Sequence, residues 1–235
     1  MTFDWSQYKG NLPWLKDRTI YLTVSGSRAY GTNLEGSDFD YRGIAVAPRE
    51  YYLGVMNRFE QAECKDPDLT IFDLQKFIKL ATDCNPNICE MLYTEPSDRL
   101  IVTSLGQRLI DNRDLFLSQK AKYTFSGYAY AQLKRIKESN FAERLKPAMH
   151  LVRLMTMCRE ILEEGVIRTR RPDAEFLLSI RNGAWSYDQL AAWAERQDSE
   201  LTALMSTSKL PKTPDRKKID KLCVEMMEEA LAQQS

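Results

Sequence analysis

The stretch from Gly26 to Val46 (GSRAYGTNLEGSDFDYRGIAV) constrains the fold of this chain more than any other. It joins two β-rich segments, residues 19–24 and 39–47, through a Gly-Ser pair and a polar insert, and Asp38 and Asp40 lie at the mouth of the second segment. Carboxylates one residue apart on an extended backbone share a face, with Cα atoms about 6.7 Å apart. Two such charges at roughly 4 Å repel by about 4 kcal/mol at an effective dielectric near 20. The stretch therefore predicts a sheet whose strand ends carry a charged site that needs compensation.

The rest of the chain changes from strand to helix patterns. Further extended segments at residues 59–64 and 69–74 flank a Lys-Asp-Pro-Asp turn. From about Ser104 onward the pattern is helical, with Gly165 expected to end one helix and Ser186 and Thr213 expected to be N-caps. The helices expected from spacing cover residues 74–82, 87–93, 121–136 and 144–164, with three more beginning near 171, 186 and 213. We predict an α+β chain, with a small mixed β-sheet domain at residues 1–103 and a helical domain at residues 104–235 packing on it.

Composition excludes several classes of protein. With 43% hydrophobic and 28% charged residues, the chain has an ordinary globular composition. No run approaches the roughly 18 apolar residues of a membrane span, and the N-terminal segment lacks the pattern of a secretory signal. The five cysteines form no C-x-x-C pair, and there is a single histidine, so we expect no zinc site. These features predict a reduced, cytoplasmic protein without a membrane partner.

The motif residues suggest a metal and a phosphate group side by side. A hard divalent cation, Mg²⁺ or Mn²⁺, would offset the repulsion between Asp38 and Asp40, and a second would give a two-metal arrangement for phosphoryl transfer. A strand that runs into Gly26 and Ser27 and then a short helix presents free N–H groups to a phosphate. Each motif alone is common, because S-D-x-D also occurs as a plain Asx turn. Joined between two strands, they predict a nucleotide site.

The Gly-Ser pair, the ten following residues and Asp38-Phe39-Asp40 resemble the G-S…D-x-D signature of the DNA polymerase β-like nucleotidyltransferase superfamily. The wider stretch at residues 26–48, with DLTIFDLQKFIKLATDCNPNICEMLY at residues 68–93, resembles the predicted nucleotidyltransferases found beside RNA ligases and associated with RNA repair. The likeness extends to KPAMHLVRLM and SIRNGAWSYDQL in the helical half. It implies a polymerase β palm-like sheet and metal-dependent transfer of a nucleoside monophosphate from an NTP to a hydroxyl, with an RNA 3′ end as the favoured acceptor.

The resemblance also implies a third carboxylate from a later strand. Asp68, which opens an apolar strand, is our choice, and Asp73 is the alternative. Their odd spacing places them on opposite faces of a strand, so only one can serve. Asp38 and Asp40 would then hold metal, and the third carboxylate would complete one metal site. It could also accept the proton of the attacking hydroxyl.

A basic stripe lies on the helix predicted at residues 144–164. Lys146, His150 and Arg153 recur at i, i+4 and i+7. Lys146 and Arg153 are expected to hold the triphosphate, and His150 to hydrogen-bond a phosphate, ribose or acceptor. The alternative is that these residues border a core and pair with acids. Arg28 is expected to contact phosphate beside Ser27 or else to face solvent, and basic clusters at residues 168–171 and 216–218 are either RNA contacts or solvated faces.

Two other functions compete with RNA-directed transfer. The same fold could be a non-catalytic module that binds a nucleotide or a partner, or an AMP-transferase that modifies a protein hydroxyl. Retention of Gly26, Ser27, Asp38 and Asp40 favours catalysis. A glycosidase is excluded because its two carboxyl groups must flank a sugar bond from different segments, which one D-x-D strand cannot do.

Overall fold

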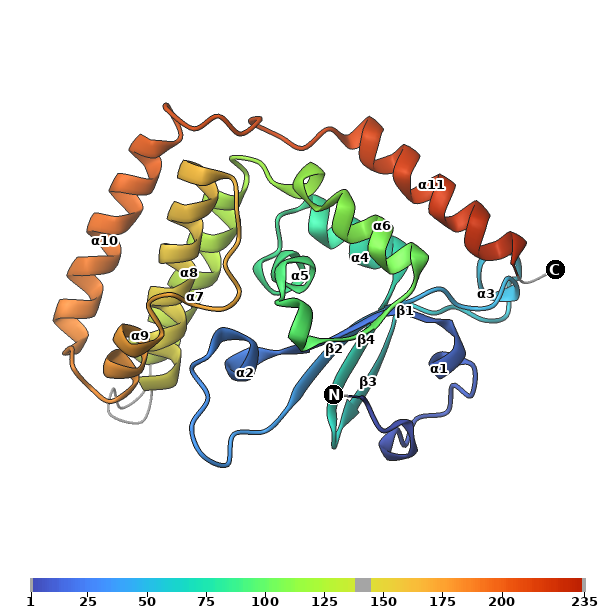
Figure 1. Cartoon of the computed structure of the whole chain (residues 1–235). Coiled ribbons are helices and arrows are strands. Elements are labelled where there is room, and N and C mark those ends of the chain that lie inside the picture. The colour runs from blue at the N-terminus through green and yellow to red at the C-terminus, as the bar shows by residue number, and fades with distance from the viewer. Residues whose placement is uncertain (1, 138–144, 234–235) are drawn as a thin grey trace.

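The computed structural model describes residues 2–137 and 145–233 and shows an α+β architecture (Figure 1). Its centre is a five-stranded sheet with the order β3-β4-β2-β1-β5. The strands are β1 (Thr19–Ser25), β2 (Asp40–Ala45), β3 (Gln61–Lys65), β4 (Asp68–Asp73) and β5 (Arg99–Val102). The sheet is mixed, because β2 and β4 run parallel while the other neighbours are antiparallel. The predicted fold class is confirmed.

Four of the strands lie where the sequence pattern placed them. Every residue of β1 is buried, as expected for the inner strand of a covered sheet. Strand β2 begins at Asp40, so Asp38 and Phe39 lie in the loop before it rather than in the strand. The edge strand β5 was not predicted. It spans only Arg99–Val102 and pairs with β1, and so short a segment carries no clear alternation.

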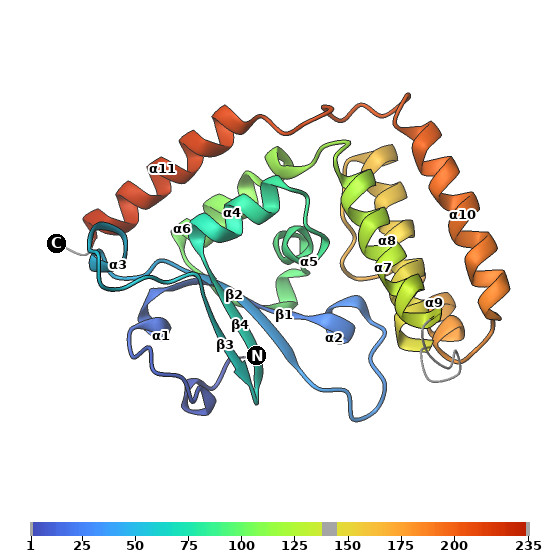
Figure 2. The ribbon, with the colours of Figure 1, turned by 180° about the vertical axis from the view of Figure 1, so that it is seen from behind.

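The two faces of the sheet are covered differently. Short helices α4 (Leu74–Thr82), α5 (Pro86–Cys89) and α6 (Ser104–Asp111) cover one face, and the C-terminal helix α11 (Arg216–Ala232) lies across them (Figures 1 and 2). The N-terminal segment covers the other face through Phe3 and Leu15, and it contains a 3₁₀ turn at Trp5–Gln7 and α1 (Leu15–Arg18). Burial on both faces fixes the register of the strands, since a one-residue slip would expose their apolar side chains.

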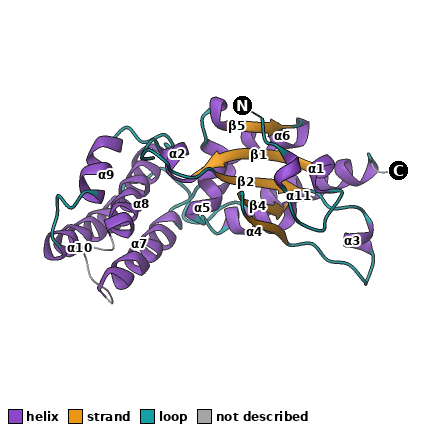
Figure 3. Ribbon diagram, turned by 90° about the horizontal axis from the view of Figure 1, so that it is seen from below, coloured by secondary structure: helices purple, strands orange, loops and turns teal. Residues whose placement is uncertain are grey.

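The remaining long helices form a separate group beside the sheet. They are α7 (Ala121–Lys137), α8 (Leu145–Glu164), α9 (Ala174–Arg181) and α10 (Tyr187–Leu204). Together they enclose their own apolar core, in which α8 is the most buried element. Figure 3 shows this group beyond one end of the sheet, with the short helix α2 (Gly26–Tyr30) between the sheet and α8.

The remaining short elements connect these parts. They are α3 (Glu50–Leu53) and 3₁₀ turns at Glu90–Tyr93, Pro96–Asp98 and Arg113–Phe116. Within residues 2–137 and 145–233, no helix has the length and apolar character needed to span a bilayer.

Two predicted helix ends are confirmed and one is wrong. Gly165 follows α8 with φ +71°, and Ser186 caps α10 in a capping box with Gln189. Thr213 is not an N-cap: α11 is capped by Asp215, whose carboxylate accepts from the Lys218 N–H at 3.1 Å. A carboxylate at the helix start satisfies a free N–H, so the helix starts two residues later than predicted. The helix then packs on α4, so the helices after residue 103 fall into two groups.

Candidate functional site

The turn from β1 into α2 is shaped around one carboxylate. Gly26 has φ +64°, and a Cβ built on it would lie 1.9 Å from Oδ2 of Asp40. Ser25 is the register partner of Asp40 on the adjacent strand, which brings the turn against that side chain. Only glycine permits both this backbone conformation and this approach. The Gly-Ser pair and Asp40 therefore form one compact unit at the ends of β1 and β2.

Asp40 and Asp68 face each other across the parallel strands β2 and β4. They are direct register partners, and their carboxyl groups are hydrogen-bonded to each other. Burial, followed by the hydrogen bond and charge of Asp68, raises the pKa of Asp40 to about 6. Burial opposes the ionisation of Asp68, but its hydrogen bonds with Arg42, at 2.9 Å, and with Asp40 leave its pKa lowered. Asp68 is thus a stable anion, whereas the neighbouring Asp40 ionises only at a higher pH than an ordinary carboxyl group.

Asp38 lies on the exposed loop before β2, outside the strand. Arg28 organises this loop: its Nε lies 3.2 Å from the carbonyl oxygens of Ser37 and Asp38, and its guanidinium stacks 3.8 Å from the centre of the Phe39 ring. Among the described residues, no group of three or more His, Cys, Asp or Glu side chains is placed to hold a metal ion together. The structure therefore brings together Asp40 and Asp68, with Asp38 on the adjoining loop.

Asp73 has a structural task at the other end of β4. Its carboxylate accepts a hydrogen bond from the Gln75 N–H at 2.9 Å and so caps α4, and it also accepts from the Tyr52 hydroxyl. Its register partner is Ala45, five positions along β2 from Asp40. Of the two carboxylates considered for the third position, the one near Asp40 is Asp68.

A cavity of about 720 Å³ lies between this end of the sheet and helices α7 and α8. This volume is within the range of small-molecule sites. Among the predicted site residues, it is lined by Gly26, Ser27, Asp40, Lys146, His150 and Arg153. Asp38, Asp68 and Arg28 are not among its lining residues. The wall opposite the sheet is formed by side chains of α7, which the sequence did not single out.

His150 contributes a neutral ring to this cavity. Burial, with the nearby positive charges of Arg153, Lys146 and Arg181, lowers its pKa to about 3. The imidazole is therefore uncharged at neutral pH and is limited to hydrogen bonding. Lys146, one turn earlier on α8, is exposed and supplies positive charge at the same wall.

Arg153 is buried and holds two parts of the molecule together. Its guanidinium is ion-paired with Glu90 at 2.8 Å and lies 3.9 Å from the centre of the Tyr30 ring. The Tyr30 hydroxyl donates to the other oxygen of Glu90. Because Tyr30 ends α2, this triad ties α8 to the helix that begins with Gly26. The Nε of Arg153 is buried and has no hydrogen-bond partner among the described residues.

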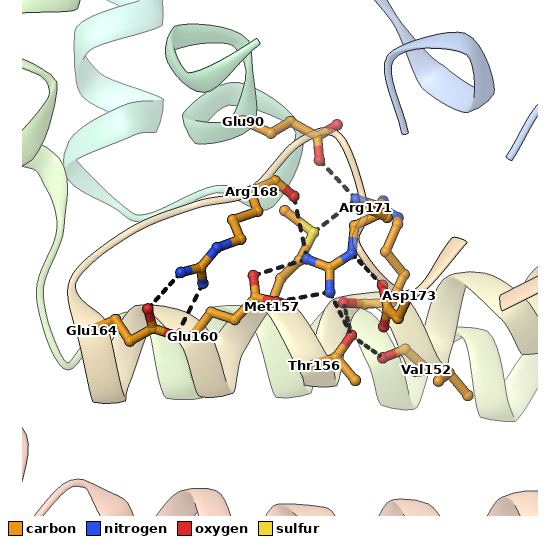
Figure 4. Close-up of polar contacts among 10 residues, drawn as sticks. Glu90, Val152, Thr156, Met157, Glu160, Glu164, Arg168, Arg171 and Asp173 are labelled. Atoms are coloured by element: carbon orange, nitrogen blue, oxygen red, sulfur yellow. Dashed lines mark hydrogen bonds and ion pairs between the residues drawn. The ribbon is translucent and has the colours of Figure 1, made fainter. Parts of the chain in front are cut away.

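The segment at residues 168–173 strengthens the same connection. Both Arg171 terminal nitrogens lie 2.9 Å from Glu160, its Nε lies 2.8 Å from Asp173, and Arg168 pairs with Glu164 (Figure 4). The Arg171 N–H donates to the Tyr30 carbonyl at 3.0 Å. The Thr169 hydroxyl donates to the backbone carbonyl of Glu90, also at 3.0 Å. This basic cluster, considered above as an RNA contact, is thus occupied by internal pairs.

Sequence reasoning missed Tyr30, and it interpreted Glu90 only as a capping or packing carboxylate without a named partner. Both residues lie in stretches that carry the resemblance, but partners 60 residues apart share no local spacing. The available signal was an acid among the apolar residues 88–92, just after the Asn85-Pro86 helix start, because an acid in an apolar setting requires a partner.

A family model described as the RNA repair pathway DNA polymerase beta family matches residues 9–225. An uncharacterized 38.9 kDa protein of Enterobacteria phage T4 is 29% identical over 175 residues, which cover 67% of this chain and 51% of that protein. The protein YcgL of Bacillus subtilis is 24% identical over 155 residues, or 64% of this chain and 58% of its own length. The chain thus spans between half and three fifths of the length of these curated relatives.

A nucleotidyltransferase-like protein from Exiguobacterium sibiricum is a further match among solved structures. The two share 12% sequence identity, the match covers 92% of this chain and 70% of that protein, and the TM-score is 0.27.

Proposed function

Because the chain belongs to the RNA repair pathway DNA polymerase beta family, we propose that it transfers a nucleoside monophosphate from an NTP to a hydroxyl group, most readily at an RNA 3′ end. The observation that carries the proposal is the meeting of Asp40 with Asp68 directly beside the Gly26-Ser27 turn, at the mouth of a cavity lined by basic residues. Carboxylates and free N–H groups at one point match the two halves of a metal-bound triphosphate.

The donor set fits Mg²⁺ or Mn²⁺. Asp40 and Asp68 offer hard oxygen ligands whose contact is unfavourable without a cation, as the raised pKa of Asp40 indicates. Asp38, two residues before Asp40, could supply a further oxygen from the loop. A bound cation would neutralise charge on the phosphates and on the attacking and leaving oxygens. With Asp73 engaged as a helix cap, Asp68 is the better candidate for the third carboxylate.

The other residues would bind and orient the substrate. Gly26 and Ser27 line the cavity, so the N–H groups of their turn and the Ser27 hydroxyl would bind the phosphates, and Lys146 would pair with the phosphates from α8. The acceptor hydroxyl would form a bond to the α-phosphorus as the bond to the bridging oxygen breaks, and pyrophosphate would leave with that oxygen. The hydroxyl proton would pass to a carboxylate, a role that we assign to Asp68 as the register partner of Asp40.

Labelled nucleotides provide the test. Purified protein would be incubated with Mg²⁺ or Mn²⁺, each of the four α-labelled NTPs, and short RNAs, total RNA or the protein itself as acceptor. We expect label in RNA, lost in Asp40→Asn and Asp68→Asn but kept in Glu35→Gln. Glu35 is a matched control because it is an exposed acid on the loop that also carries Asp38.

Each alternative function has its own outcome. Label on the protein instead of RNA would indicate an AMP-transferase-like activity. Metal-dependent NTP binding without any transfer would indicate a non-catalytic module. Transfer that persists in Asp40→Asn would contradict the proposed site.

A further inference from the structure

The α7 wall of the cavity has an unusual composition for a helix face. Tyr123, Gly127 and Ala131 follow one another at intervals of four residues and all line the cavity. The Tyr123 side chain is 65% exposed, and the neighbouring Tyr128 is held by a hydrogen bond from the Asn85 amide to its hydroxyl at 2.8 Å. A strip of small residues beside an aromatic ring therefore lines the same cavity as the Gly26-Ser27 turn.

Gly127 has no structural reason to be glycine. It lies inside α7, and a Cβ built on it would meet no atom of the described residues within 4 Å. Its φ is not in the left-handed region that favours glycine. A glycine inside a helix costs about 0.5–1 kcal/mol relative to alanine. Helix α7 is therefore less stable with glycine than with alanine at position 127, although a Cβ there would contact no described atom.

A second observation points to a ligand in the same cavity. Arg153 lines the cavity from α8 and is only 3% exposed, yet its Nε has no hydrogen-bond partner among the described residues. A buried guanidinium donor without a partner is costly unless something fills its place. The cavity is therefore lined by the small residues of α7 and by a buried arginine, Arg153, whose Nε lacks a partner among the described residues.

We infer that the Tyr123-Gly127-Ala131 strip is a nucleobase-binding surface. This rests on the proposed function, since the triphosphate would occupy the Gly26-Ser27 end and its base would extend toward α7. The base would lie over Gly127 against the Tyr123 ring, and any larger side chain at position 127 would take its place. Stacking on an aromatic ring accepts every base. Asn87 and Gln132 also line the cavity, and their carboxamides are groups that can hydrogen-bond a base edge.

Comparing NTPs with inorganic tripolyphosphate separates base contacts from phosphate contacts. With Mg²⁺ present, we expect the wild type to bind NTPs more tightly than tripolyphosphate. Gly127→Leu should weaken NTP binding about tenfold, leave tripolyphosphate binding unchanged, and raise or preserve thermal stability, because leucine favours helix. Tyr123→Leu should act in the same direction. Tyr130→Leu is the matched control, because Tyr130 lies on the same helix near Glu195 and Asp198 of α10.

The outcomes separate this inference from the proposed function. Equal affinities for NTPs and tripolyphosphate in the wild type, or an unchanged ratio in Gly127→Leu, would overturn the base surface alone if Gly127→Leu also leaves RNA binding unchanged. Failure of the wild type to bind either would overturn both proposals. A short RNA in the same assay distinguishes the source of the base: if Gly127→Leu weakens RNA binding and spares NTPs, the surface receives the terminal base of the acceptor.

Discussion

The two ends of helix α2 differ in how well their charged groups are satisfied. At the first end, Gly26 touches Asp40, whose pKa is raised by burial and by Asp68. At the other end, the Tyr30 hydroxyl and ring contact Glu90 and Arg153, which are themselves ion-paired. One end carries a carboxyl pair in which only Asp68 is ion-paired, with Arg42, whereas the other is a nearly complete buried network.

The contrast shows how a short helix can support an unfavourable charge arrangement. Five residues of α2 could not hold the Gly26 turn in place alone, because an isolated helix of that length is unstable. The network around Glu90 and the segment at residues 169–171 anchors it to both the 3₁₀ turn at Glu90–Tyr93 and α8. Unfavourable local charge at a functional site is commonly supported by well-satisfied contacts nearby.

The largest expected effect is on nucleotide transfer and comes from removing a carboxylate at the Gly26 end of α2. Asp40→Asn should lower nucleotide transfer on the order of 1,000-fold, the scale seen when one electrostatic contact to a transition state is lost. The free energy of unfolding should stay equal or rise at neutral pH, because the contact between two carboxylates is removed. Initial transfer rates and urea unfolding check both halves. A variant with reduced stability would show that this carboxyl pair supports the fold.

Disrupting the Glu90 network at the Tyr30 end of α2 should instead lower the stability of the protein. Glu90→Ala leaves the buried charge of Arg153 without a partner and should lower the free energy of unfolding by about 3–5 kcal/mol. Replacing both residues, as in Glu90→Ala with Arg153→Met, should restore part of this loss. Urea denaturation of the wild type and the two variants provides the measurement. If the single Glu90→Ala variant unfolds like the wild type, the ion pair does not anchor α2.

A smaller change isolates the tyrosine. Tyr30→Phe keeps the ring beneath Arg153 but leaves one Glu90 oxygen without its donor, which should cost about 1–3 kcal/mol. Tyr93→Phe is a suitable control, because the Tyr93 hydroxyl donates to the exposed Asp114 at 2.8 Å. Equal losses of unfolding free energy in the two variants would mean that burial does not strengthen the contribution of the Tyr30–Glu90 contact to stability.

The same contrast explains which parts the sequence could predict. Local patterns located β1, β2, β3, β4 and most helices, since alternation and helical spacing are properties of neighbouring residues. The resemblance implied a third carboxylate from a later strand, and Asp68 was our choice for it. The parallel pairing that places Asp68 opposite Asp40 could not be predicted, because register depends on the whole sheet.

The network around Glu90 was beyond local patterns. Its members come from α2, the 3₁₀ turn at Glu90–Tyr93 and α8, and only packing of the two parts brings them together. Arg153 belongs to the predicted basic stripe, but its partner Glu90 lies 63 positions away and could not be named from local spacing. Gly127 carried a signal that was overlooked, because a glycine within an otherwise regular helical pattern calls for a reason.

His150 offers the subtlest test of how the cavity wall is charged. The chain has a single histidine, so its imidazole resonances can be followed by NMR without assignment ambiguity. Burial and three neighbouring cations lower its pKa to about 3 from 6.5, so the ring should stay neutral as the pH falls through 6.5. The unfolded chain takes up that proton first. Relative to His150→Gln, the wild type should therefore lose about 2 kcal/mol of stability by about pH 5. A titration midpoint near 6.5 in the folded protein would mean that His150 is open to water and is not affected by the charges of Lys146, Arg153 and Arg181.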